Sequence, residues 1–360
     1  MTMLRKGLLG ALFALAALLP AEAADKSVPP TPDQTVTFPG GVVLHRDLVY
    51  AAIEGFRPLT LDLYQVPAKP KDTPQPAILF VHGGDWVTGD ARHLAGFDDF
   101  PATLAALAAK GYVVASVNYR LSGEAHFPAA IQDVKSAVRW LRGHAGDYNI
   151  DTTRVMAWGA EAGGQIAAMV GTSCGVNALE PAADAKSKAT LASDCVQGVI
   201  DWYAPADLAS WDTGGAHPSE PGAPTHLGAY LGCEAADCAP GLVRAASPLS
   251  YISTLSPPFL IQHGSADTRV APDQSQKLND ALRDQHVPSE VVVYPGAGQD
   301  FTKDGAPNPA ANAKALADLE DFIVKTFPPA PASAKPAAIS PAKSNAAKAT
   351  RPRSSAKARK

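Results

Sequence analysis

A glutamate in the sequence lies where a sharp turn would expose its side chain to a ligand. The largely apolar residues 154–158 predict a strand, and Gly159-Ala160-Glu161-Ala162-Gly163 follows them and leads into a helix predicted from residue 165. Glycine permits close backbone approach, so two glycines four residues apart favour a strained strand-to-helix turn. Glu161 is at the apex of this turn, where a carboxylate can act as a nucleophile or bind as an anion at the helix N-terminus.

Polar residues follow three further predicted strands. The strand at residues 77–81 leads into His82-Gly83-Gly84-Asp85-Trp86, whose glycines would let backbone N–H groups approach an anionic atom. The last two predicted strands lead into Asp267 and Gln299, respectively. Because a glutamine amide can donate to a carboxylate, we expect Gln299 to lie within hydrogen-bonding distance of Asp267.

Strands and helices alternate along the chain. Strands are predicted at residues 42–50, 59–64, 77–81, 112–117, 154–158, 196–202, 259–262 and 291–294, and helices at 100–110, 128–142, 271–283 and 310–327 and from 165 onward. The first two strands are expected to pair antiparallel at an edge of the sheet. The alternation that follows predicts an α/β fold with a mostly parallel, doubly wound sheet.

One stretch, residues 204–250, interrupts the alternation of strands and helices. It is rich in Pro, Gly, Ala and Asp, and it contains Trp211, His217 and His226. An insertion of this kind often covers the ligand cleft as a loop-rich cap. The alternative interpretation is a surface excursion without a function.

Together the motifs resemble the esterase/lipase branch of the α/β-hydrolase family, and within it the secreted feruloyl and acetyl-xylan esterase-like (BD-FAE-like) proteins. The matching segments are residues 82–86, 119–121, 127–141, 159–164, 263–267 and 295–301. The resemblance spans residues 40–327 and implies an α/β-hydrolase fold for one domain at residues 41–327.

The resemblance also implies a role for each matching position. Asp267 corresponds to the acid of the family's catalytic triad. Glu161 stands where the family has its nucleophilic serine, and Gln299 stands where it has its histidine. The other expected site residues are Gly83, Gly84 and Ala162 for the oxyanion hole, and Trp86 and Tyr203 for ligand contacts.

These replacements affect the nucleophile, at Glu161, and the base that transfers protons, at Gln299. Glutamine cannot serve as a base, and losing either the serine or the histidine of such a triad costs on the order of a millionfold in rate. One hypothesis is therefore a non-catalytic binding or scaffold protein that keeps a cleft for a small ester or an acylated glycan. The alternative is an active carboxylic-ester hydrolase in which Glu161 forms a covalent ester. No cofactor is implied, and no spacing of His, Asp and Glu predicts a metal site.

The first 23 residues have the pattern of a signal peptide. Arg5 and Lys6 precede the apolar residues 8–19, and Ala21-Glu22-Ala23 fits a cleavage site. A membrane anchor is the alternative, but the apolar run is shorter than a bilayer requires, and no other stretch predicts a transmembrane segment. We therefore expect export to the periplasm or beyond, and a Pro-rich linker at residues 24–40.

Export would place the four cysteines in an oxidising compartment. Four cysteines allow three pairings, and we expect the sequential one, Cys174–Cys195 and Cys233–Cys238. A metal site or a reactive thiol is the alternative, although no C-x-x-C motif or clustered histidine accompanies the cysteines.

The net charge of −4 is unevenly distributed along the chain. Residues 328–360 contain eight Lys and Arg residues and no acidic residue, so the rest of the chain carries −12. An acidic body argues against nucleic-acid binding. The tail is predicted to be disordered, either as a solvated segment or in contact with an anionic cell envelope.

Overall fold

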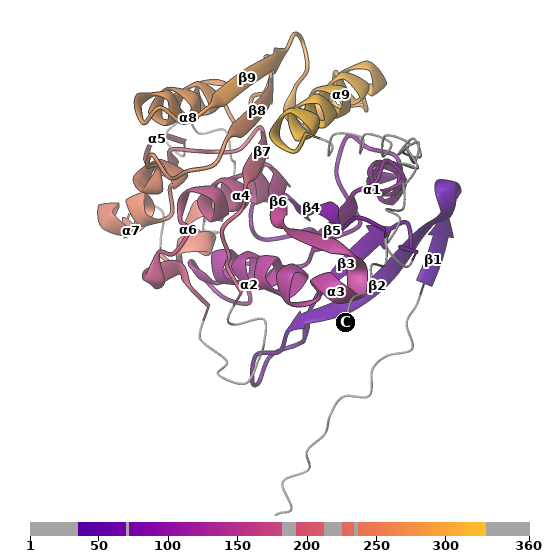
Figure 1. Cartoon of the computed structure of the whole chain (residues 1–360). Helices are drawn as coiled ribbons and strands as arrows, with labels where there is room; N and C mark the ends of the chain where they lie inside the picture. The colour runs from indigo at the N-terminus through magenta and orange to yellow at the C-terminus, as the bar shows by residue number, and fades with distance from the viewer. Residues whose placement is uncertain (1–34, 70–71, 182–191, 212–224, 234–236, 329–360) are drawn as a thin grey trace, which may run out of the picture.

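The computed structural model describes residues 35–69, 72–181, 192–211, 225–233 and 237–328 (Figure 1). The predicted signal peptide, most of the predicted linker and nearly all of the basic tail lie outside these residues. The centre of the molecule is a sheet of nine strands: β1 (Thr35–Phe38), β2 (Val42–Ala51), β3 (Leu59–Gln65), β4 (Gln75–Val81), β5 (Val113–Val117), β6 (Ile150–Ala160), β7 (Gly198–Trp202), β8 (Phe259–Gly264) and β9 (Ser289–Tyr294).

The strand order β1-β2-β3-β5-β4-β6-β7-β8-β9 confirms the predicted sheet. The pairs β1–β2, β2–β3 and β3–β5 are antiparallel. All the remaining pairs, from β5–β4 to β8–β9, are parallel. Two expectations were wrong. Residues 35–38, predicted as linker, form β1, so β2 and β3 are not at the edge. Four residues that alternate between partly buried and exposed are too few to give a clear periodic signal.

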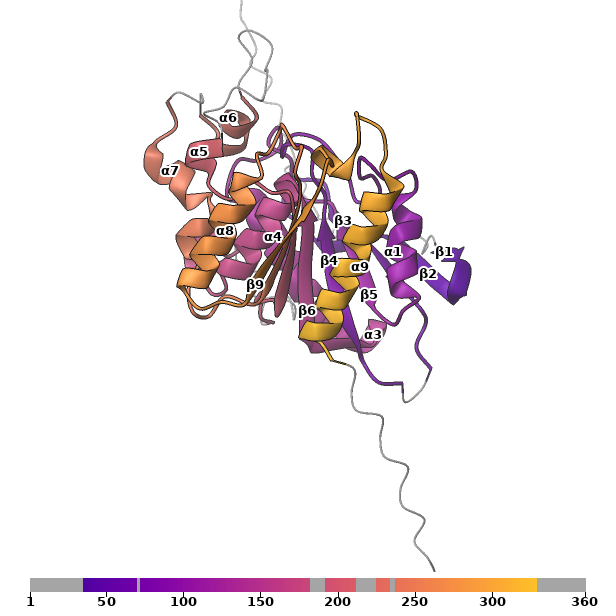
Figure 2. The same ribbon diagram turned by 90° about the horizontal axis from the view of Figure 1, so that it is seen from above.

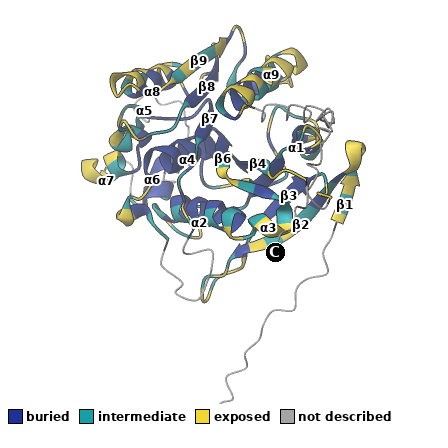
Figure 3. Ribbon diagram, viewed as in Figure 1, coloured by how far each residue is buried: buried dark blue, intermediate teal, exposed yellow. Residues whose placement is uncertain are grey.

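Helices cover both faces of the sheet. They are α1 (Phe100–Ala108), α2 (Ala129–Gly143), α3 (Ala145–Tyr148), α4 (Ala162–Thr172), α8 (Asp273–Asp284) and α9 (Pro309–Thr326), with 3-10 turns η1 (Pro39–Gly41), η2 (Asn177–Leu179), η6 (Pro248–Tyr251) and η7 (Gln299–Phe301). Figure 2 shows α4 and α8 on one side of the sheet and α1 and α9 on the other. The central strands are buried on both faces (Figure 3), which accounts for their largely apolar sequences.

The described part of residues 204–250 forms α5 (Leu208–Trp211), α6 (His226–Leu231), α7 (Pro240–Ala245) and η6. These helices gather at one end of the molecule (Figure 2). Trp86, in the loop after β4, stacks on Tyr230 of α6 with ring centroids 4.5 Å apart and meets Trp211 of α5 edge-on at 5.6 Å. The insertion therefore packs on one of the glycine-rich loops. His217 lies outside the described residues.

Both expected disulfides are present, Cys174–Cys195 and Cys233–Cys238. The first joins the end of α4 to the segment before β7, and the second lies just after α6. Within the described ranges, no helix is long and apolar enough to cross a membrane.

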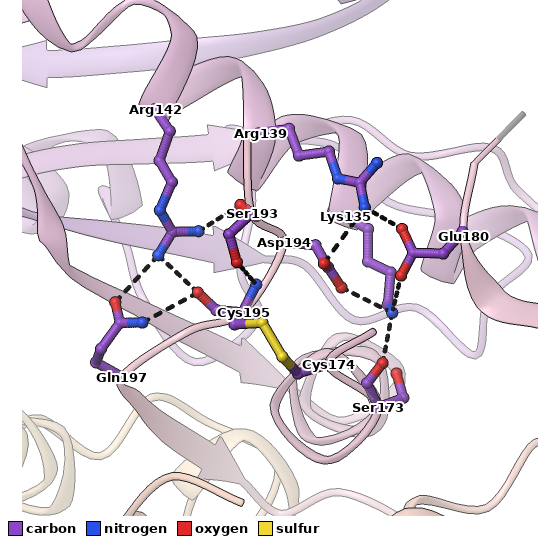
Figure 4. The surroundings of a disulfide bond; sticks show 10 residues. All are labelled: Lys135, Arg139, Arg142, Ser173, Cys174, Glu180, Ser193, Asp194, Cys195 and Gln197. Atoms are coloured by element: carbon purple, nitrogen blue, oxygen red, sulfur yellow. Dashed lines mark hydrogen bonds and ion pairs between the residues drawn. A yellow bond between two sulfur atoms is a disulfide. The ribbon is translucent and has the colours of Figure 1, made fainter. Parts of the chain in front are cut away.

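A buried ion cluster beside the first disulfide fixes the same segment to α2 (Figure 4). Lys135 is fully buried, and its Nζ donates to the carbonyl oxygen of Ser173 at 2.6 Å and to Glu180 at 3.0 Å. Lys135 Nζ also lies 2.8 Å from Asp194 Oδ2, and Arg139 contacts both carboxylates. Buried charges are tolerated when they are paired in this way, so α2 contributes a polar face as well as its apolar one.

Candidate active site

The turn between β6 and α4 has the geometry that the glycine spacing predicts. Glu161 adopts φ 53° and ψ −117° at its apex. A Cβ on Gly159 would lie 2.1 Å from the carbonyl oxygen of Gly163, and a Cβ on Gly163 would lie 2.0 Å from that of Val81. No side chain fits at either distance, so the turn requires both glycines.

The Glu161 carboxyl group binds backbone amides of the loop after β4. Gly84 N donates to Glu161 Oε2 at 2.8 Å, and Asp85 N donates to the same oxygen at 2.9 Å. The backbone N–H of Ala162, at the start of α4, also acts on this carboxyl group and lowers its pKa. Gly84 and Asp85 have φ of 103° and 54°, the left-handed conformation that turns successive N–H groups toward one point.

The amides around the Glu161 carboxyl group differ in one respect from those expected to form an oxyanion hole. Gly84, which was expected, donates to Oε2 together with Asp85, which was not, and the Ala162 amide lowers the pKa of the carboxyl group. Gly83 instead packs against the turn, where a Cβ would lie 2.9 Å from the carbonyl oxygen of Ala160 and 3.0 Å from Glu161 Oε2. Its lack of a side chain permits the close approach of the two loops.

Gln299 and Asp267 lie side by side, as the sequence predicts. The amide orientation that satisfies both groups places the Gln299 nitrogen 3.0 Å from Asp267 Oδ1. Asp267 Oδ1 also accepts from the backbone N–H groups of Arg269 at 2.8 Å and Val270 at 3.0 Å. A glutamine at this position can therefore hold the carboxylate, but it has no basic nitrogen with which to accept a proton.

The burial of Glu161 determines its protonation. Only 4% of the residue is exposed, and this burial, with the negative charge of Asp85 as the next cause, raises the pKa of Glu161 to about 8. The hydrogen bonds from the amides of Asp85 and Ala162 oppose that rise. Burial also acts to raise the pKa of Asp85, but Arg269, a hydrogen bond with Glu161, and His226 together lower it. At neutral pH the glutamate therefore carries a proton and the aspartate does not.

A cavity of about 220 Å³ opens above these groups. Its walls come from the loops after β4, β6, β8 and β9, and the lining residues are Gly83, Gly84, Gly89, His93, Leu94, Ala95, Glu161, Arg269, Gln299 and Asp300. The structure thus brings Glu161 and Gln299 to one pocket, with Asp267 behind Gln299. Arg269 and Asp300 give the cavity a charged wall. Burial raises the pKa of Asp300 to about 6, which still leaves its carboxyl group mostly ionised at neutral pH, and Arg269 faces Asp85.

Trp86 and Tyr203, expected as ligand contacts, do not line this pocket. Both side chains are fully buried. Trp86 donates to Gln165 Oε1 at 3.0 Å and packs on the cap helices. Burial, with the negative charge of Asp300 as the next cause, raises the pKa of Tyr203. These positions support a corrected interpretation, in which the two aromatic side chains hold the loops that form the pocket.

The sequence analysis did not identify several residues that line the pocket. Arg269 is two residues after Asp267, and Asp300 directly follows Gln299, so their positions just after predicted strands could have identified them. His93, Leu94 and Ala95 come from a loop without a recognisable motif. The part of the chain that the structure describes contains no cluster of three or more metal-ligating side chains.

Comparison with known proteins identifies the family to which the chain belongs. A model of the BD-FAE family matches residues 61–282, which is more than half of the chain. The chain belongs to the BD-FAE family. Two curated relatives of this chain are esterases of Mycobacterium tuberculosis. Esterase LipC is 32% identical over 68% of this chain and 58% of its own length. Esterase LipQ is 31% identical over 64% of this chain and 51% of its own length.

Solved structures of esterases have the same fold. A truncated carbohydrate esterase from gut microbiota matches 82% of this chain and 98% of its own, with a TM-score of 0.63 and 27% identity. Esterase 2 of Thermogutta terrifontis matches 82% of this chain and 96% of its own, with a TM-score of 0.61 and 26% identity. This BD-FAE protein is therefore an esterase-like α/β-hydrolase. It spans between half and three-fifths of the length of the two curated relatives.

Proposed function

We propose that this BD-FAE protein binds a small ligand in an esterase-type pocket without hydrolysing it. One observation carries the proposal: the Glu161 carboxyl group accepts hydrogen bonds from the amides of Gly84 and Asp85. In an esterase, amides of this kind stabilise the oxyanion that forms during acyl transfer. Here they are already occupied by the protein's own side chain, so a substrate carbonyl oxygen has no place among them.

The residues beside this carboxyl group also argue against hydrolysis. Serine-type acyl transfer needs a base that accepts a proton from the nucleophile and later returns it to the leaving group. Gln299 stands beside Asp267 in the place where the resemblance puts that base. Its amide can hold the acid in position but takes no part in proton transfer.

A carboxylate nucleophile is the alternative route, and three features of Glu161 disfavour it. Its raised pKa, about 8, keeps it protonated at neutral pH, whereas attack requires the anion. Its Oε2 is held by two amides. The covalent ester that it would form needs an activated water for release, and Gln299 cannot activate one.

The ligand that we propose is a small ester or an acylated glycan. The pocket of about 220 Å³ has both donors and acceptors on its wall, which suits a ligand rich in oxygen atoms. Two solved relatives are described as a carbohydrate esterase and as a bifunctional GH43-CE protein. We further propose that the protein is exported, because its two disulfides suit an oxidising compartment, and that its basic tail contacts an anionic cell envelope.

A variant series tests the absence of hydrolysis. Initial rates with p-nitrophenyl acetate are measured for the wild type, Glu161→Ser, Gln299→His and the double variant. We expect hydrolysis above background only in the double variant, because the triad acts as a unit. Adding Asp267→Asn to the double variant should remove most of the gained activity. Wild-type hydrolysis equal to that of the double variant would overturn the proposal.

A further inference from the structure

Two buried carboxyl groups, Glu161 in the pocket and Asp85 beside it, each keep one oxygen that no described donor reaches. Glu161 Oε2 accepts the amides of Gly84 and Asp85, whereas Glu161 Oε1 has no hydrogen-bond donor. Asp85 Oδ2 faces Arg269 and lies 3.1 Å from His226 Nδ1, whereas Asp85 Oδ1 has no donor. Unsatisfied buried oxygens are costly, so two of them on carboxyl groups that affect each other's pKa indicate an interaction between the two groups.

A single proton satisfies both oxygens. A hydrogen bond between the two side chains contributes to the pKa of each group, and two ionised carboxylates cannot form such a bond. We propose that Glu161 and Asp85 share one proton between these two oxygens, and that this proton keeps the cap helix α6 packed against the loop after β4. Glu161 is the residue that carries the proton, because its pKa is raised and that of Asp85 is lowered.

The charged and titratable groups around the pair come from every loop that meets the pocket. Asp85 is on the loop after β4, Arg269 and Asp267 follow β8, and His226 begins α6. Six titratable or charged side chains interact electrostatically with this pair or with the side chains in contact with it. They are Tyr119, Tyr203, His226, Asp267, Arg269 and Asp300. Arg269 is the cation that faces Asp85 most closely, and it compensates one negative charge rather than two.

Asp85 connects the shared proton to the cap. Its carboxylate contacts His226 of α6, and its neighbour Trp86 stacks on Tyr230 of the same helix. If Glu161 ionises, the amides of Gly84 and Asp85 and the N-terminus of α4 retain the new anion. Repulsion then displaces the Asp85 side chain, and α6 loses its contact through His226.

Hydrogen exchange of α6 tests this proton-dependent contact. Exchange of peptides covering residues 225–233 is compared at pH 6 and pH 9.5, on either side of the Glu161 pKa of about 8, after correction for intrinsic exchange rates. We expect wild-type protection in α6 to fall on the order of tenfold at the higher pH, while α9 keeps its protection. In Glu161→Gln the amide still donates to Asp85 and does not ionise, so α6 should keep its protection at both pH values.

Infrared difference spectra between the wild type and Glu161→Gln provide the second readout. A protonated buried carboxyl group should appear at pH 6 and disappear as the pH rises past 8. Equal pH responses of α6 in the two proteins, or no protonated carboxyl band in the wild type at pH 6, would overturn the inference. Neither readout depends on whether the protein hydrolyses esters, so this test and the kinetic test of the proposed function fail independently.

Discussion

The stability of the protein should change with pH in a way that Glu161→Gln removes. The native pKa of Glu161 is about 8, compared with 4.5 for an ordinary glutamate. Between these values the native state keeps a proton that the unfolded chain has released, so the free energy of unfolding falls as pH rises from 4.5 to 8. Each pKa unit corresponds to about 1.4 kcal/mol, so a shift of this size is worth up to about 5 kcal/mol.

Urea denaturation of both proteins across this pH range measures the effect. Other groups also titrate, but most of them are common to the two proteins, so the difference in unfolding free energy isolates Glu161. We expect the variant to match the wild type near pH 5 and to exceed it by several kcal/mol near pH 9. A difference that stays constant with pH would refute the assignment of a proton to Glu161.

Two further predictions concern the cluster around the first disulfide. Lys135→Met removes the buried ammonium group from Glu180 and Asp194 and leaves Arg139 as the cation that contacts both carboxylates. It should lower the free energy of unfolding by about 3–5 kcal/mol, measured by urea denaturation at neutral pH. The matched exposed control, Lys314→Met, should change it by less than about 1 kcal/mol. Replacing Cys174 and Cys195 by serine opens a loop of 21 residues and should cost about 3 kcal/mol in the same assay, and an unchanged denaturation midpoint would contradict this.

The sequence predicted the sheet well because its central strands are buried on both faces. Residues 77–81 form a continuous apolar run, and residues 113–117 are interrupted only by Ser116. Such runs are typical of strands covered by helices on both sides. The short strand β1 was missed because its four residues follow a Pro-rich stretch and give only a weak alternation. Pairing with β2 stabilises it, and the sequence of β1 does not contain that information.

The site was predicted in part. Motif order located Glu161, Asp267 and Gln299, and the structure places Gln299 against Asp267. The donor role of the Asp85 amide could not be predicted, because it depends on a left-handed backbone conformation that a non-glycine residue rarely adopts. The burial of Trp86 likewise depends on contacts with Trp211 and Tyr230, which are distant in the sequence.

Ester turnover by the unmodified protein tests the central claim most directly. The wild type is incubated with a short p-nitrophenyl ester at saturating concentration, with Glu161→Gln in parallel, and release of p-nitrophenol is followed together with the intact mass of the protein. We predict no release above the buffer rate and no acyl adduct in either protein. Sustained release by the wild type that is abolished in Glu161→Gln would contradict the account.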